Sequence, residues 1–331
     1  MITKTKLGNF DLIIVERENI IIELMNYGAT IYSLKTPDKN GIFEDIVLQY
    51  ENPEDYLNNS IYLNSTTGPI AGRIKNGILE VNNEIYRLNK NDHGNTLHSG
   101  DLALSFKTFD FDYKEGIEYD EINFIYQEKQ LIDYNLIVSY KIYDSKVEIE
   151  YQAKPKKDFI FSLTNHGYFN LSGNLKSDIK NHLVKLNTNL RHDIDDFLVN
   201  NNQIIQEEGI YNFTNKKKIG IAISELEKDP KMGVDDIFFY PQNKLNNPMA
   251  IVEEEVSGRR MQVYSTMDHL VFYTHNNVNN LGLKHLDGHK KHYSLCFEAQ
   301  KAPYGFSDNR TQKIIIEKNQ VFKEKIIFEF I

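Results

Sequence analysis

Short apolar runs, interrupted by polar and turn residues, recur along the chain, and few of them show the spacing of an amphipathic helix. Such runs occupy residues 107–113, 121–127, 131–144, 146–155 and 259–276. They are rich in β-branched and aromatic residues, which favour strands. Turn signals separate them at a spacing that is typical of β-sandwiches. The chain is therefore predicted to be all-β.

Turn and helix signals refine this picture only locally. Asn-Gly at 40–41 and Asn-Asn at 82–83 predict hairpin turns, because both residue types tolerate positive φ. Residues 219–223 (IGIAI) are interpreted as a strand, and a capping-box pattern predicts a short helix that begins at Ser224. Large all-β domains of this length occur, so residues 1–331 are expected to form a single domain.

Composition narrows the class of protein. The 331 residues carry 38 basic and 47 acidic side chains, and the net charge of -9 argues against a nucleic-acid partner. Cys296 is the single cysteine, so no internal disulfide can form. The sequence contains no signal-peptide pattern and no run long enough for a membrane span. A soluble, cytoplasmic protein without a membrane partner is expected.

Residues 161–173 (FSLTNHGYFNLSG) place His166 among aromatic residues, with Gly167 behind it. The unperturbed pKa of histidine lies near 6.5, so an imidazole at this place suits proton transfer near neutral pH. A core histidine that is satisfied by a backbone carbonyl is the alternative, and this stretch alone does not decide between them.

A second stretch, residues 295–300 (LCFEAQ), holds one glutamate in an otherwise apolar strand. Side chains alternate along a strand, so Cys296, Glu298 and Gln300 share one face. Burying an unpaired carboxylate is costly, so Glu298 is expected either to be tied up by a partner or to do chemistry. With His166 on another strand, it supplies the two groups that general acid–base catalysis needs.

Three loops carry further polar candidates. Arg73 lies in a glycine- and proline-containing loop, where its guanidinium can donate to a hydroxyl-rich ligand or form a surface ion pair. His93 and His98 lie five residues apart, but no further ligand completes a metal-binding pattern. Asp235 and Asp236 stand at the start of a predicted strand.

The histidines at 285, 289 and 292 lie in a lysine-rich stretch, KHLDGHKKH. This composition is typical of a solvated loop, so no metal site is predicted there.

Taken together, six short motifs resemble the aldose 1-epimerase family, the galactose mutarotases. The motifs are GATIYSLKTPDKNG, GRIKNG, NTLHSG, TNHGYFNLSG, GVDD and CFEAQ, in that order. They extend over nearly the whole chain, and TNHGYFNLSG is the most specific of them.

The resemblance implies a large antiparallel β-sandwich of the galactose mutarotase type (a supersandwich) with few short helices and an open sugar cleft. It implies that Glu298 is the general base and His166 the general acid. His98 is expected beside the sugar as a third catalytic residue, and the residues expected to bind the sugar are Arg73, Asp235, Asn165 and Gln300. Neither a metal nor an organic cofactor is expected, and the partner is a small aldose sugar, bound by a monomer or homodimer.

The implied reaction interconverts the α and β anomers of a free aldohexose such as galactose or glucose. The base removes a proton from the C1 hydroxyl while the acid protonates the ring oxygen, and ring closure from the other face gives the other anomer. His166 must then carry a proton, so Asp235 or another acidic side chain is expected to stabilise its charged form.

Three departures from the family pattern bear on specificity. Gly72 stands where an asparagine is frequent, Asp236 stands where a histidine is frequent, and residues 303–309 (PYGFSDN) replace a different loop motif. Asp236 is expected to add negative charge at the mouth of the cleft, which disfavours a phosphorylated sugar.

Three alternatives stay open at this point. A hexose-6-phosphate 1-epimerase would need more cations than Arg73, and Arg259 and Arg260 are the candidates. A glycoside hydrolase would use Asp235 and Glu298 as its two carboxylates, but it would leave His166 without a role. A non-catalytic sugar-binding protein on the same fold would not need the acid–base pair.

Overall fold

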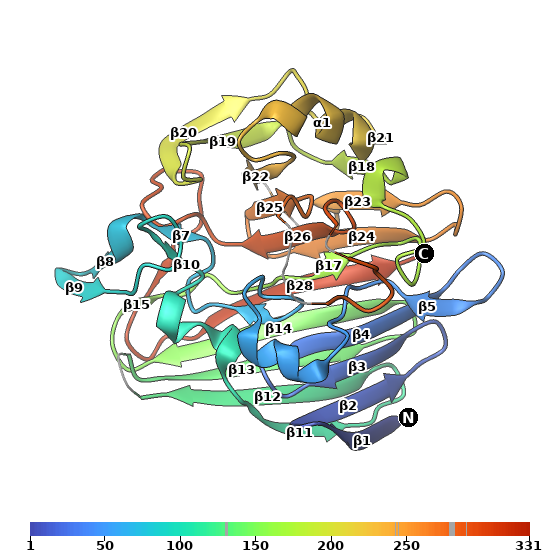
Figure 1. The fold of residues 1–331 in the computed structure, drawn as a ribbon. Helices are drawn as coiled ribbons and strands as arrows, with labels where there is room; N and C mark the ends of the chain where they lie inside the picture. Colours follow the sequence, from blue (N-terminus) through green and yellow to red (C-terminus); the bar gives the residue numbers. More distant parts are fainter. Residues whose placement is uncertain (130–131, 242, 244, 278–281, 289) are drawn as a thin grey trace.

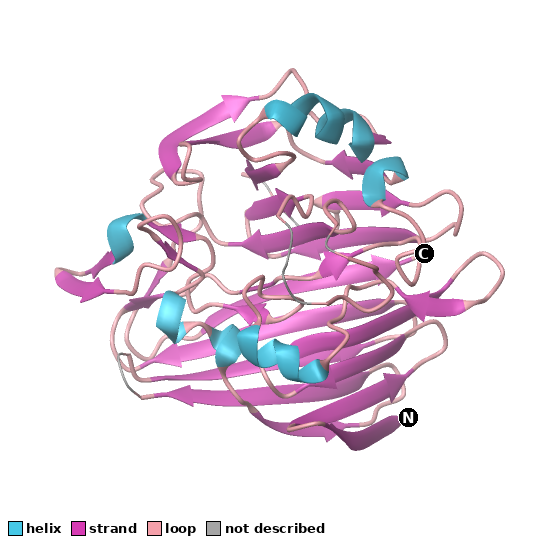
Figure 2. Ribbon diagram, in the orientation of Figure 1, coloured by secondary structure: helices cyan, strands magenta, loops and turns pink. Residues whose placement is uncertain are grey.

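Antiparallel strands dominate the structure, a computed structural model that describes residues 1–129, 132–241, 243, 245–277, 282–288 and 290–331 (Figures 1 and 2). The predicted all-β class is confirmed, and helices are few and short among the described residues. His289 lies outside the described residues, and His285 is exposed. No described helix has the length and apolar character needed to cross a membrane.

The largest sheet in the described chain has nine strands in the order β11-β12-β13-β14-β28-β24-β23-β18-β21. Its strands are β11 (Asp110–Lys114), β12 (Asp120–Glu128), β13 (Tyr134–Ile142), β14 (Lys146–Pro155), β28 (Phe322–Phe330), β24 (Arg260–Ser265), β23 (Ala250–Glu253), β18 (Leu183–Leu186) and β21 (Lys217–Lys218). In β13, Tyr134, Leu136 and Val138 are buried while Asn135 and Ile137 are exposed. This period-two burial is why the segment folds as a strand with one face on the core.

In the described part of the chain, two further sheets of five and six strands pack beside the nine-stranded sheet. A five-stranded sheet follows the chain order: β1 (Ile2–Leu7), β2 (Phe10–Glu16), β3 (Ile21–Met25), β4 (Thr30–Pro37) and β5 (Phe43–Asp45). A six-stranded sheet has the order β17 (Tyr168–Phe169), β26 (Leu295–Gln300), β25 (His269–Tyr273), β22 (Asp235–Phe239), β19 (Leu190–Ile194) and β20 (Asn200–Gln206).

Short elements connect these sheets. Two-stranded pairs are β7 (Arg73–Ile74) with β10 (Thr96–Leu97), β6 (Thr66–Thr67) with β16 (Thr164–Asn165), β15 (Phe159–Ile160) with β27 (Ile315–Ile316), and β8 (Ile78–Val81) with β9 (Glu84–Arg87). The helices are α1 (Ile219–Glu225) and the 3-10 turns Pro53–Asn58, Lys75–Gly77, Gly100–Leu102, Leu104–Phe106, Ile179–Asn181 and Leu226–Lys228.

The core joins the six-stranded sheet to the nine-stranded sheet. Phe272 and Phe297 stack on one face of the six-stranded sheet, with ring centroids 5.0 Å apart, and Phe169 contacts Phe328 of β28 at 4.9 Å. These side chains belong to one continuous buried cluster. The opposite face of β26, β25 and β22 is therefore free to carry polar side chains.

The interpretation of residues 219–223 as a strand is wrong, and so is the predicted start of a helix at Ser224. Helix α1 begins at Ile219 and ends at Glu225, and its cap residue Lys218 makes no side-chain capping bond. Ile219, Ala222 and Ile223 are buried at helical spacing. Packing of this apolar stripe stabilises a helix that the isoleucine-rich sequence disfavours locally.

Candidate active site

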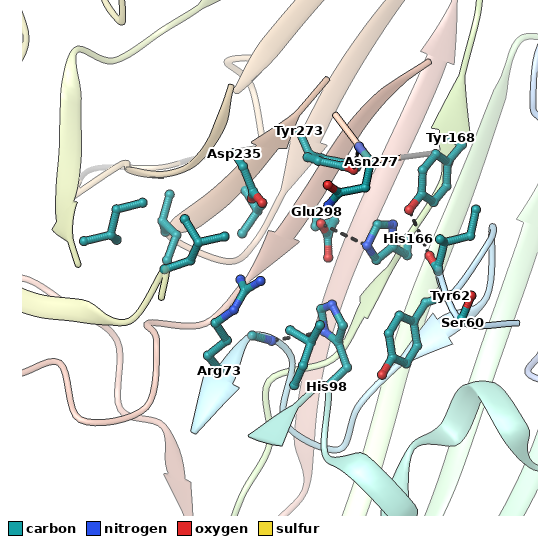
Figure 3. A pocket seen from close by; sticks show the side chains of 17 residues that line it. Ser60, Tyr62, Arg73, His98, His166, Tyr168, Asp235, Tyr273, Asn277 and Glu298 are labelled. Atoms are coloured by element: carbon teal, nitrogen blue, oxygen red, sulfur yellow. Dashed lines mark hydrogen bonds and ion pairs between the residues drawn. The ribbon is translucent and has the colours of Figure 1, made fainter. Parts of the chain in front are cut away.

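A cavity lies on the polar face of the six-stranded sheet, and side chains from strands and loops far apart in the sequence converge on it (Figure 3). Glu298 in β26 and Asp235 in β22 point into it from the sheet, and Arg73, His98 and His166 enter from loops and short strands. The structure thus brings together five of the seven residues that the sequence singled out.

Glu298 and His166 form a close pair of titratable groups in the cavity. Oε1 of Glu298 lies 3.5 Å from Nε2 of His166, and the two residues are 3% and 6% exposed. Burial raises the pKa of Glu298 to about 8, assisted by the negative charge of Asp235 and opposed by Arg73. Burial lowers the pKa of His166 to about 3. At neutral pH the pair therefore holds one proton, and the uncharged arrangement is favoured in the free protein.

The expectation that Asp235 or another acid keeps His166 charged is therefore wrong for the free protein. The carboxyl group that faces His166 is that of Glu298. Loss of hydration on burial is the main cause of the lowered pKa of His166. Asp235 itself has its pKa raised by burial to about 6. Moving one proton from Glu298 to His166 would give the charged arrangement without any exchange with solvent.

Aromatic packing fixes the imidazole ring of His166. The ring of Tyr168 stacks on it at 4.9 Å with 10° between the planes, and the ring of Tyr62 lies nearly parallel at 6.3 Å. Gly167 is required between His166 and Tyr168, because a Cβ there would lie 2.6 Å from the ring of Phe169. The glycine in the TNHGYF motif thus permits the close packing that orients the histidine.

The backbone of Gly72 forms hydrogen bonds with both the ring and the backbone amide of His98. The amide of Gly72 donates to Nδ1 of His98 at 3.2 Å, and the amide of His98 donates to the carbonyl of Gly72 at 3.0 Å. Nδ1 accepts, so neutral His98 carries its proton on Nε2, the nitrogen not engaged by Gly72. Gly72 has φ +84°, a conformation that glycine adopts without strain and asparagine tolerates.

Arg73 and Asp235 face each other across the cavity (Figure 3). Asp92 holds the arginine in place, because Nε of Arg73 donates to Oδ2 of Asp92 at 2.7 Å. This leaves the terminal nitrogens of the guanidinium, which point into the cavity, as donors for a ligand. His93, beside Asp92, has a largely exposed side chain and does not line the cavity.

Asn165 and Gln300 were expected to contact the sugar, but neither residue lines the cavity. Both are fully buried. The amide of Asn165 donates to the carbonyl of Asn64 at 2.9 Å, so it supports the loop that carries Tyr62. Cys296 is also fully buried, and it lies on the same face of β26 as Glu298.

Asp236 does not add charge at the cleft mouth, and that expectation is corrected. It lies on the opposite face of β22 from Asp235, is fully buried, and accepts from Arg191 at 2.9 Å and from Lys231 at 2.9 Å. Tyr211 packs against both cations. Asp236 is a structural ion-pair residue, so its charge says nothing about a phosphorylated ligand.

We expect Asp236→Asn to lower the free energy of unfolding by about 3 kcal/mol, because it leaves two partly buried cations without their shared carboxylate. Urea unfolding followed by circular dichroism measures this. Asp196→Asn is the matched control, since Asp196 is exposed, and its unfolding midpoint should stay unchanged. Equal midpoints for both variants would contradict the structural role.

Arg259 and Arg260 do not reach the cavity. Arg259 is buried, donates to the carbonyls of Thr36 and Leu171, and pairs with Glu44 at 3.2 Å. Arg260 pairs with Glu253 at 3.5 Å. Among the residues that line the cavity, all of which are described, Arg73 is the one cation that is always charged.

The donor atoms of His98, His166 and Glu298 also lie within 4.8 Å of one another. Two imidazoles and a carboxylate form a donor set that Zn²⁺ accepts in proteins. No metal is expected at these residues from the sequence. The proton transfers that the same groups can perform need none.

Two residues of the site could not be identified from the sequence: Tyr62 lines the cavity, and Asp92, which does not line it, holds Arg73. The ring of Tyr62 packs edge-on against that of His98 at 4.6 Å. Tyr62 has a φ of 56°, which no glycine or asparagine at this position indicates in the sequence. Asp92 was passed over beside His93, although it orients Arg73.

Comparisons with known proteins agree on one group. A sequence model of a family described as aldose 1-epimerase matches residues 11–329. The aldose 1-epimerase of Streptococcus thermophilus is 26% identical over 344 residues, which cover 100% of this chain and 97% of that protein. The galactose mutarotase of Homo sapiens is 25% identical over 329 residues, which cover 98% of this chain and 94% of that protein.

A solved structure shares the fold. The galactose 1-epimerase from Lactobacillus acidophilus NCFM superposes with a TM-score of 0.84 at 24% identity, and the match covers 100% of this chain and 98% of that one. The predicted sandwich of the galactose mutarotase type is therefore confirmed.

Proposed function

The chain belongs to the aldose 1-epimerase family, and from this premise we propose that it interconverts the α and β anomers of a free aldohexose, with Glu298 as general base and His166 as general acid. The protein is a carbohydrate isomerase, as its family and its relatives are. The observation that carries the residue roles is the buried contact of Glu298 with His166 at 3.5 Å.

Ring opening needs two coordinated proton transfers. A carboxylate at Glu298 accepts the proton of the C1 hydroxyl, and the protonated Nε2 of His166 gives its proton to the ring oxygen, so that the C1–O5 bond breaks and the C1 carbonyl forms. The C1–C2 bond rotates, and the two residues then act in exchanged states. Closure on the other face of the carbonyl gives the other anomer.

The single proton of the pair fits both halves of this cycle. In the charged arrangement, Glu298 is a base and His166 an acid, which suits the closed ring. In the uncharged arrangement, Glu298 is an acid and His166 a base, which suits the open aldehyde. Because burial favours the uncharged arrangement, sugar hydroxyls near Glu298 must stabilise its carboxylate for ring opening to begin.

The other cavity residues are proposed to hold the sugar in place. The terminal nitrogens of Arg73 and Nε2 of His98 are donors, and the Asp235 carboxyl is an acceptor, so that hydroxyls on one ring can be bound from two sides. Positioning of this kind supplies much of the rate enhancement in a reaction with a modest intrinsic barrier.

Nuclear magnetic resonance exchange spectroscopy at anomeric equilibrium tests the function. We expect exchange cross-peaks between the α and β anomeric protons of galactose or glucose when the protein is added, with little exchange for galactose 6-phosphate, because Arg73 is the one lysine or arginine that lines the cavity and its donors are proposed to bind sugar hydroxyls. Exchange of the phosphorylated sugar alone would contradict the proposed substrate class.

We also propose that residues 1–331 act as one domain, in a monomer or homodimer, in the cytoplasm. Sedimentation velocity at several protein concentrations tests the assembly state.

A further inference from the structure

The charged form of His166 has few polar partners in the structure. Nε2 faces Oε1 of Glu298 at 3.5 Å, a separation beyond the usual range of a hydrogen bond. Nδ1 is buried and, in the part of the chain that the structure describes, meets no hydrogen-bond partner. The backbone of His166 itself favours the charged form, but burial is the larger effect and lowers the pKa to about 3. Further stabilisation of the imidazolium must therefore come from contacts with the faces of its ring.

An aromatic ring lies against one of these faces (Figure 3). The ring centroids of His166 and Tyr168 are 4.9 Å apart, with 10° between the planes. A cation within about 6 Å of a tyrosine ring centroid is attracted by the negative charge of the ring face, and more strongly where water is excluded. Both residues are buried. The ring of Tyr62 is also nearly parallel to that of His166, but at 6.3 Å it is the more distant of the two.

Three anchors hold the ring of Tyr168 at this distance. Its hydroxyl donates to the carbonyl of Ile61 at 2.9 Å, and its amide donates to Oδ1 of Asn64 at 2.9 Å. In the strand pairing of β17 with β26, Tyr168 is the direct partner of Cys296. The stack on His166 is therefore a built feature of the fold and not a chance contact of two mobile side chains.

No competing cation occupies the ring of Tyr168. Its other ring contacts are edge-on, with Tyr273 at 6.3 Å and with His275 at 5.6 Å. Burial lowers the pKa of His275 to about 4 and raises the pKa of Tyr273, so both are uncharged near pH 7. In the described chain, the lysines and arginines that lie over aromatic rings are over rings other than that of Tyr168. The negative face of this ring is thus available to His166.

We propose that Tyr168 is a positioning residue of the acid–base pair, whose ring face stabilises the imidazolium form of His166 by a cation–π contact. The inference rests on the proposed function, in which ring opening begins from that form. When the proton moves from Oε1 of Glu298 to Nε2 of His166, the new positive charge lies beside both the carboxylate and the ring of Tyr168. The stack that orients the imidazole thereby also favours its charged form.

Phenylalanine analogues with one to four ring fluorines at position 168 test this, because each fluorine weakens the negative charge of the ring face and hardly changes its size. Tyr168→Phe is the reference of the series. We expect kcat for galactose or glucose, followed by polarimetry, to fall steadily along the series by about threefold to thirtyfold in total, as for the loss of a buried cation–π contact. The KM should stay within about twofold, because Arg73, His98 and Asp235 are proposed to bind the sugar.

The matched control places the same analogues at Phe124, a buried ring of β12 whose ring contacts are Phe109, Phe111 and Tyr140. There kcat should not change. A constant kcat along the series at position 168 would overturn the proposal. A rise in KM at constant kcat would overturn it too, since it would place the ring against the sugar and not in support of His166. Tyr168→Leu, which has no ring face, should lower kcat by at least as much as the most fluorinated analogue.

Nuclear magnetic resonance titration of the His166 ring separates this inference from the proposed function. The midpoint, about 3 in the native protein, should move lower along the fluorinated series, because an electron-poor ring supports the imidazolium less. If the wild-type protein does not speed anomeric exchange, the proposed function fails, and the midpoint alone then decides the contact. A midpoint that stays constant along the series would overturn the cation–π contact whether or not the protein is active.

Discussion

Replacing Glu298 by glutamine should reduce kcat by about a thousandfold or more while leaving the fold intact. The amide has nearly the same shape as the carboxyl group but cannot accept the C1 proton, and loss of a positioned general base costs about 10²–10⁴ in rate. In this variant no proton can pass between residue 298 and His166. His166 is therefore disabled as well, because the two groups act as a unit. Polarimetry with fresh α-D-galactose measures the effect.

The matched control is Glu255→Gln, which makes the same chemical change at an exposed position of the β23–β24 connection. It should keep wild-type kcat. The two variants should also share a melting temperature within a few degrees, or Glu298→Gln should be the more stable, since a buried ionisable group is removed. Comparable activity of Glu298→Gln and wild type would exclude Glu298 as the base.

Replacing His166 by asparagine should reduce kcat by about 10²–10⁴, because the ring oxygen then lacks a proton donor. His285→Asn is the control on an exposed histidine and should have no effect. The KM for the sugar should change much less than kcat, since His98, Arg73 and Asp235 remain to bind it.

The pH profile of kcat/KM separates this acid role from a purely structural one. The pair holds one proton between the pKa of His166, about 3, and that of Glu298, about 8. Above about pH 8 the pair loses that proton, no acid remains, and kcat/KM should fall about tenfold per pH unit. In Asp235→Asn, which removes the cavity carboxyl whose pKa is about 6, the profile should stay flat between pH 5 and 7. A fall in that variant that begins near pH 6.5 on the acid side would mean that His166 titrates as an ordinary exposed histidine.

Much of the fold followed from local patterns. Period-two burial, as in β13, is a property of a few neighbouring residues, so the strands could be predicted. Residues 219–223 could not, because isoleucines favour a strand locally and only tertiary packing of Ile219, Ala222 and Ile223 makes the segment helical. Sheet order also depends on contacts between distant segments, as between β14 and β28.

Part of the candidate site could also be predicted from local motifs, and part could not. His166, Glu298, His98, Arg73 and Asp235 lie in short motifs and converge as the resemblance implied. The roles of Asn165 and Gln300 were misjudged, because burial behind a cavity wall is not visible in a motif. The position of Asp236 was predictable in principle, since adjacent residues in a strand point to opposite faces. Its two cations, Arg191 and Lys231, were not, because one of them comes from a different strand.

The charge state of the Glu298–His166 pair could not be predicted from the sequence, for a physical reason. Whether a carboxylate raises the pKa of a histidine depends on how much water both groups lose, and that is a property of the whole fold. The same burial that disfavours the imidazolium in the free protein keeps one proton on the Glu298–His166 pair, and the proposed mechanism uses that proton.

The most direct test follows the optical rotation of freshly dissolved α-D-galactose and α-D-glucose with the wild-type protein. The account predicts a first-order approach to equilibrium whose rate rises in proportion to protein concentration for at least one sugar, with an unchanged final rotation. If both sugars reach equilibrium at the rate of buffer alone, the assignment of Glu298 and His166 as a working acid–base pair is contradicted.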